Sequence, residues 1–69
     1  MTPYSILVTA EQTCHTIEIR EVATGKEGVA NTAGDMVAVF YGADDGSDDK
    51  VITVEEFNHL FEITACIAG

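Results

Sequence analysis

The sequence predicts an α+β domain in which one C-terminal helix packs on a three- to four-stranded, mainly antiparallel sheet. Three observations lead to this fold class. Residues 15–22 alternate between apolar and polar side chains, residues 36–41 are apolar throughout, and residues 53–56 have the pattern of a helix start. A chain of 69 residues has room for one domain, and we assign residues 1–69 to it.

The first two strands are expected in the N-terminal part of the chain. Residues 4–9 are rich in residue types that favour strands, so they are predicted as the first strand. In residues 15–22, Ile17 and Ile19 point to one side of the second strand. One face of this strand is therefore expected to be buried and the other to be wet.

The middle of the chain contains the most apolar strand. Residues 36–41 are typical of a strand that is covered on both faces near the centre of a sheet. Residues 50–52 can add a short fourth strand. Residues 29–34 are weakly patterned, and a short strand, a loop and a poor helix all remain open for them.

A helix is expected from about residue 54. Thr53 and Glu56 have the spacing of a capping box, in which the hydroxyl and the carboxylate satisfy the first free backbone amides. Ile52 and Phe57 have the spacing of a hydrophobic staple. The apolar stripe that should lie on the sheet consists of Phe57, Leu60, Phe61, Thr64 and Ile67.

The charge of the chain is strongly negative. Twelve acidic residues stand against three basic ones, which gives a formal net charge of −9. Such a field disfavours direct binding to nucleic acid or to an anionic membrane and favours a basic protein surface as partner. The alternative is that the charge serves solubility alone. The expected partner-binding residues are the densest carboxylates of the chain: Asp44, Asp45, Asp48, Asp49, Glu55 and Glu56.

Residues 45–57 resemble an EF-hand calcium loop. Asp45, Ser47 and Asp49 stand at the first, third and fifth ligand positions, and Glu56 stands at the bidentate twelfth. A lysine occupies the sixth position, where the family has glycine. The resemblance implies a calcium site made by these four residues. We expect an ordinary loop followed by a capped helix, with no metal or cofactor, and keep the calcium site as the alternative.

The two cysteines are too few and too far apart for a zinc or redox motif. We expect Cys14 and Cys66 to be small buried residues of a reduced, cytoplasmic protein, with a disulfide as the alternative. Cys14 precedes His15, but neighbours in a strand point to opposite faces, so this pair is not expected to form a nucleophile and its base. The protein is therefore not expected to be an enzyme.

In size, acidity and compact folding, the chain resembles small phage-encoded inhibitors such as anti-CRISPR proteins and DNA mimics. The resemblance implies a non-enzymatic protein that occupies a basic, nucleic-acid-binding surface of a partner protein. Two alternatives remain: a calcium-binding module, and a small homo-oligomeric structural protein. A homodimer is the simplest form of the last, since small cores often gain stability from a partner subunit.

Overall fold

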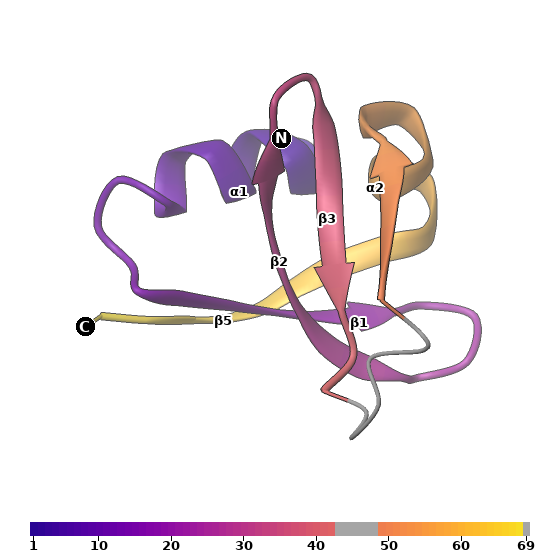
Figure 1. Ribbon diagram of the computed structural model, residues 1–69. Helices are drawn as coiled ribbons and strands as arrows, with labels where there is room; N and C mark the ends of the chain where they lie inside the picture. Colours follow the sequence, from indigo (N-terminus) through magenta and orange to yellow (C-terminus); the bar gives the residue numbers. More distant parts are fainter. Residues whose placement is uncertain (43–48, 69) are drawn as a thin grey trace.

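The computed structural model describes residues 1–42 and 49–68, which form two helices and five strands (Figure 1). The strands make one antiparallel sheet in the order β4-β3-β2-β1-β5. The α+β class is confirmed, although the chain has more strands and one more helix than the sequence predicts. In chain order the elements are α1 (Pro3–Ala10), β1 (Thr16–Glu21), β2 (Glu27–Ala33), β3 (Met36–Phe40), β4 (Lys50–Thr53), α2 (Val54–Leu60) and β5 (Phe61–Ile67).

The central strand β2 joins two parts of a bent sheet. Its first residues pair with β1 and its later residues pair with β3, so Val29 stands opposite both Glu18 and Phe40. From the edge strand β4, the chain passes through α2 to β5 at the opposite edge (Figure 1). This crossing puts the first and last strands side by side.

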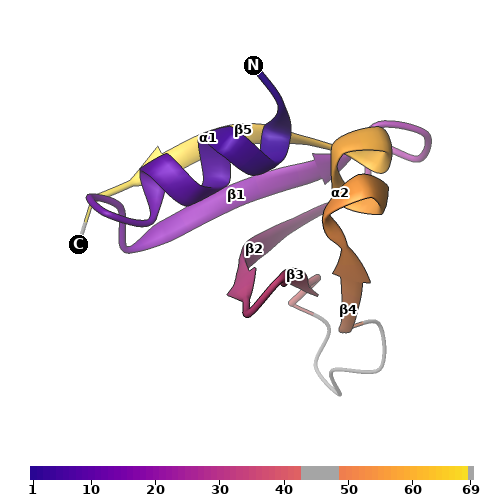
Figure 2. The same cartoon turned by 90° about the horizontal axis from the view of Figure 1, so that it is seen from above.

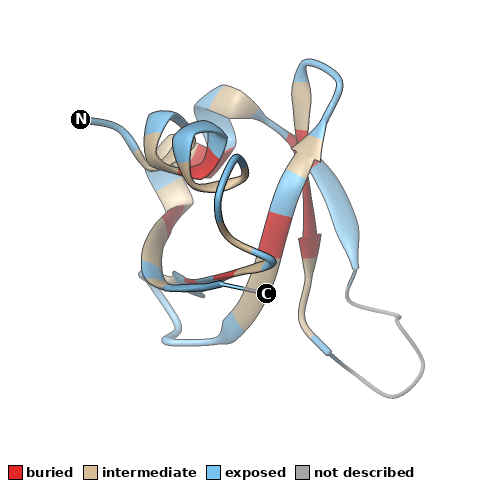
Figure 3. Ribbon diagram, turned by 90° about the vertical axis from the view of Figure 1, so that its left-hand side faces the viewer, coloured by how far each residue is buried: buried red, intermediate tan, exposed pale blue. Residues whose placement is uncertain are grey.

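The core lies between the two helices and one face of the sheet, which we call the inner face. Leu7 of α1 and Phe57 of α2 are both fully buried in it, so both helices cover the same face (Figures 2 and 3). α1 contacts β5, β2 and α2. The buried core residues are Leu7, Ile17, Ile19, Ala30, Val37, Val39, Ile52, Phe57 and Phe61.

The predicted strand over residues 4–9 is wrong, because this segment is the helix α1. Thr2 and Ser5 form a capping box, and Pro3 occupies the first turn, where its missing N–H costs nothing. Tyr4 and Ala10 pack against the core on either side of Leu7. Their spacing of three residues matches one face of a helix and overrides the strand preference of the individual side chains.

The predicted helix start is correct, but the helix is shorter than expected. α2 begins at Val54 behind the Thr53 capping box and ends at Leu60. Residues 61–67 form β5, which pairs with β1 from end to end except for a register shift at Thr64. The prediction that Thr64 and Ile67 continue the apolar stripe of the helix is therefore wrong, because both residues lie in β5 and are exposed.

The predicted strands over residues 15–22 and 50–52 are confirmed as β1 and β4. Residues 36–41 contain β3 as expected, next to the central strand. The weakly patterned residues 29–34 belong mostly to β2. The middle of β3 is buried on both faces, as expected, since Val37, Ala38 and Val39 are all buried. Both helices, however, lie on the inner face.

The two cysteines are not free thiols. Cys14, which follows α1, is bonded to Cys66 in β5, with the two Cα atoms 5.7 Å apart. The expectation of two buried, reduced cysteines is therefore wrong, and Cys66 is exposed. The crossing of the chain to β5 brings together two residues that are 52 positions apart.

Candidate protein-binding surfaces

The structure describes only some of the acidic residues that the sequence singles out. Asp44, Asp45 and Asp48 lie outside the described residues, whereas Asp49, Glu55 and Glu56 are described and exposed. Asp49 precedes β4, and the two glutamates follow it. Since a strand rises about 3.3 Å per residue, the four residues of β4 hold these groups roughly 13 Å apart. The described acids therefore lie at two ends of a strand.

Two of these three carboxylates have a local structural role. Asp49 Oδ1 accepts a hydrogen bond from the Tyr41 N–H at 3.2 Å. Glu56 Oε1 accepts from the Thr53 N–H at 3.2 Å and from the Thr53 hydroxyl at 3.1 Å. Glu55 forms no hydrogen bond or ion pair with the residues that the structure describes. It is therefore the carboxylate of this set that a partner can reach without competing with the fold.

Asp35 adds a further carboxylate to the end of the sheet where α2 begins. The β3–β4 pairing sets Met36 opposite Thr53, the residue that caps α2. Asp35 immediately precedes Met36 and is exposed, so it lies beside the first turn of α2. We call Asp35, Glu55 and Glu56 the acidic end. The sequence does not reveal Asp35 as part of this group, because it is far from Glu55 in the chain and only the β3–β4 register brings the two together.

The surroundings of the acidic loop differ from those that the EF-hand resemblance implies. The strand β3 precedes the loop, and the strand β4 separates it from α2, whereas that family places a helix before its loop. Glu56 is held by its own capping box. Asp45 and Ser47 lie outside the described residues. Within residues 1–42 and 49–68, no three potential metal ligands of the His, Cys, Asp and Glu types come together.

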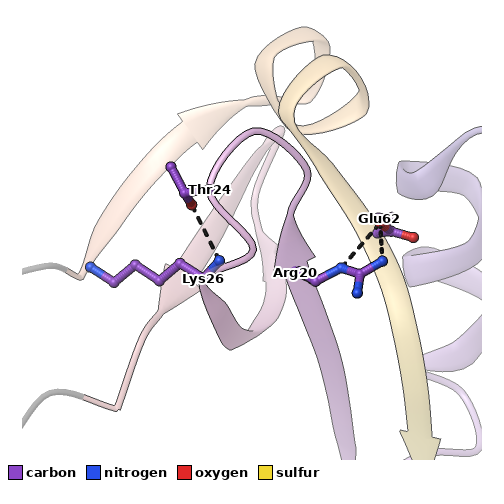
Figure 4. A network of polar contacts seen from close by, with 4 residues as sticks. All are labelled: Arg20, Thr24, Lys26 and Glu62. Carbon is purple, nitrogen blue, oxygen red and sulfur yellow. Dashed lines mark hydrogen bonds and ion pairs between the residues drawn. The ribbon is translucent and has the colours of Figure 1, made fainter.

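The cations of the chain lie against the protein's own side chains. Arg20 Nη2 is 2.7 Å from Glu62 Oε2 in an ion pair across β1 and β5 (Figure 4). This hydrogen bond and charge raise the pKa of the Arg20 guanidinium above its ordinary value. Lys26 and Lys50 place their Nζ atoms 4.3 and 5.8 Å from the centre of the Tyr41 ring. Both distances are in the range of a cation–π contact.

Tyr41 also connects this group to the core. Its ring is tilted on Phe61 with 6.4 Å between the ring centres, and Phe61 stacks on Phe57 at 5.7 Å. Both lysines thus lie at the end of β3 where Tyr41 follows the strand. Asp35 precedes the opposite end of β3, so the strand separates the two lysines from the acidic end.

Cys14 and His15 do not form a nucleophile and its base. The sulfur of Cys14 is bonded to Cys66, so it cannot act as a thiol nucleophile with His15. His15 Nδ1 instead lies 3.1 Å from the Thr16 hydroxyl.

Neither of the two described helices has the length and apolar character needed to cross a bilayer. Comparisons with protein families, curated proteins and solved structures find no match to this chain.

Proposed function

We propose that this protein is a non-enzymatic binding module that docks its acidic surface on a basic surface of another protein. The partner surface is one that binds nucleic acid, so the protein acts as an inhibitor, as anti-CRISPR proteins and DNA mimics do. The observation that supports the proposal best is the acidic end, where three exposed carboxylates lie at a distance from Lys26 and Lys50.

The physical effect of such a surface is on encounter and specificity. A local group of like charges steers a partner of opposite charge and raises the rate of association. The net charge of −9 adds a weaker field in the same sense. Asp44, Asp45, Asp48 and Asp49 are proposed as a second binding segment, because residues 44–49 carry four further charges. This segment precedes β4, whereas Glu55 and Glu56 of the acidic end follow that strand.

The test begins with a partner captured from cell extract by the immobilised protein. The binding constant is then measured for Glu55→Gln and Asp35→Asn. Each variant removes one charge from the acidic end and breaks no hydrogen bond between described residues. Each should weaken binding by roughly threefold to tenfold, since close charge pairs across an interface contribute about 1 kcal/mol or more. Raising salt from ~50 to ~200 mM should weaken binding further.

Glu21→Gln is the matched control, because it removes one charge from β1 and leaves an oxygen that can still accept from the Thr24 hydroxyl. It should change the binding constant much less. DNA or RNA that binds the partner should compete with the protein. If all three variants have the same small effect, net charge rather than the acidic end carries the interaction. A partner whose binding is unchanged by salt and by competing nucleic acid contradicts the proposal.

A further inference from the structure

A second group of apolar side chains lies on the face of the sheet that points away from both helices, which we call the outer face. None of its members belongs to the core cluster, although together they span three neighbouring strands. Val51 on the edge strand is 56% exposed, Val29, Met36 and Phe40 are partly buried, and Ala38 is only 7% exposed. The group, which we call the outer apolar patch, consists of Val29, Met36, Ala38, Phe40 and Val51.

The strand register shows that these residues share one face. Val29 stands opposite Phe40 across β2 and β3, and Ala38 stands opposite Val51 across β3 and β4. Side chains alternate along a strand, and Val37 and Val39 point into the core. Met36, Ala38 and Phe40 therefore point outward.

The composition of β3 is that of a strand covered on both faces, yet both helices lie on the inner face. A strand with one wet face normally alternates between apolar and polar residues, whereas β3 is apolar at all five positions. Apolar side chains that gather on the outer face of a small domain are typical of an interaction site. The pattern of β3 is explained if another molecule covers the outer face.

Carboxylates border the patch on the β1 side. A shallow pocket of about 220 Å³ opens there between Val29 and Phe40, and Glu18 and Glu27 form part of its wall. Glu18 is the pairing partner of Val29, so a charged group and an apolar group are adjacent across β1 and β2. Arg20, which stands opposite Glu27 on the same face, is already bound to Glu62.

We propose that the outer apolar patch binds a segment of a partner protein in which an arginine or lysine is next to an apolar side chain. The apolar side chain covers Phe40 and Val51, and the alkyl stem of the cation lies on Val29 while its head reaches Glu18 and Glu27. The inference rests on the proposed function and names a different surface for it. A second copy of the chain fits less well, because each copy carries a net charge of −9.

The experiment uses the whole protein labelled with ¹⁵N and three peptides of one length. The first is acetyl-Arg-Phe-Arg-Phe-Arg-amide, the second has serine in place of phenylalanine, and the third has glutamate in place of arginine. Only the first should cause saturable amide shifts at Val29, Ala38 and Val51, at peptide concentrations up to ~1 mM. Equal shifts with the serine peptide would show binding by charge alone and would overturn the inference.

Two variants at similarly exposed valines make the test specific. Val51→Ser removes an outer apolar side chain, whereas Val22→Ser changes a valine that is 61% exposed in the turn after β1. Val51→Ser should weaken binding of the first peptide about fivefold or more, and Val22→Ser should leave it within about twofold. Equal effects of the two variants would contradict the inference.

Further outcomes separate this inference from the proposed function. If peptide shifts occur only at Asp35 and Glu55, the acidic end binds and the outer patch does not, so the inference fails while the proposed function stands. If Val51 shifts on dilution without peptide, a second copy covers the patch and the inference is wrong. Val51→Ser should also weaken binding of the partner that was captured from cell extract. If Val51→Ser leaves binding of this partner unchanged while Glu55→Gln weakens it, the partner uses the acidic end alone and the inference is wrong.

Discussion

Gly28 in β2 lies close to the backbone at the end of β3. A Cβ atom at this position would lie 2.5 Å from the Phe40 carbonyl oxygen and 3.2 Å from the Tyr41 Cα atom, and both are backbone atoms that cannot rotate away. Glycine is therefore required by close approach of two strands.

Gly28→Ala should lower the free energy of unfolding by roughly 1–3 kcal/mol, the usual cost of forcing extra atoms into a packed region. Urea denaturation measures the loss. Gly25→Ala is the comparison, because a Cβ atom there meets nothing within 4 Å and only its φ of +77° is unfavourable. Gly28→Ala should also shift the amides of Phe40 and Tyr41, which Gly25→Ala should not. Unchanged stability would mean that β2 and β3 do not approach as described.

The start of α2 depends on two reciprocal hydrogen bonds. Thr53 Oγ1 accepts from the Glu56 N–H at 3.1 Å, and Glu56 Oε1 accepts from the Thr53 N–H at 3.2 Å. Thr53→Ala should therefore cost roughly 0.5–2 kcal/mol of stability. Because the two side chains cap the same turn, a double variant with Glu56→Ala should lose less than the sum of the single losses. Strict additivity would show that the box does not form in solution.

At the scale of elements, α1 is the part that differs most from the sequence prediction. Its hydrogen bond to α2, from the Tyr4 N–H to Asn58 Oδ1 at 2.8 Å, satisfies one of the amides that a helix start leaves free. Leu7 is fully buried against the sheet, whereas its neighbour Val8 is 38% exposed.

Leu7→Ala should cost roughly 2–5 kcal/mol, because it leaves a cavity in the centre of the core. Val8→Ala should change the stability by about 0.5 kcal/mol or less, as expected for a surface position. Denaturation curves of the two variants measure the difference. Similar costs for both would indicate that residues 3–10 do not pack through the helix face that contains Leu7.

The sequence predicts those elements whose signals are local. β1 follows from its alternation, β3 from its apolar run, and α2 from its capping box. The turn between β2 and β3 also had a readable signal, since Gly34 with a φ of 65° followed by Asp35 is typical of a two-residue hairpin loop. β5 was not predictable in this way, because Leu60 and Phe61 continue the helical spacing and only pairing with β1 makes residues 61–67 a strand.

The candidate surfaces show the same division. Glu55 could be named from the sequence because it lies in a dense acidic segment and at a helix start. Asp35 could not, since it reaches the acidic end only through the pairing of β3 with β4. The apolar run of β3 predicts a strand that is covered on both faces, whereas both helices lie on the inner face.

At the scale of the whole molecule, the disulfide closes the fold. It joins the segment after α1 to the strand β5, and β5 is the last strand of the sheet and lies at its edge. The neighbouring backbone hydrogen bond from the His15 N–H to the Ile67 carbonyl oxygen, at 2.8 Å, joins the same two segments. The disulfide therefore helps to hold β5 in place, whose pairing with β1 depends on a distant part of the chain.

Reduction of this bond should destabilise the protein strongly. Closing a loop across a separation of 52 residues removes chain entropy from the unfolded state, which in the simple chain-entropy account is equivalent to about 4 kcal/mol. A domain of 69 residues has a total stability of only roughly 3–10 kcal/mol, so the reduced protein should be close to unfolded at room temperature.

Urea denaturation with and without a reductant measures this effect. The double variant Cys14→Ser/Cys66→Ser is the control, because it should resemble the reduced protein and should not respond to the reductant. If the untreated protein reacts with a thiol reagent, or if reduction leaves its denaturation midpoint unchanged, the cysteines are not bonded in solution. A strong effect would mean that the protein folds most stably in an oxidising environment. In a reducing one, the partner would have to supply part of the folding free energy by binding the folded form alone.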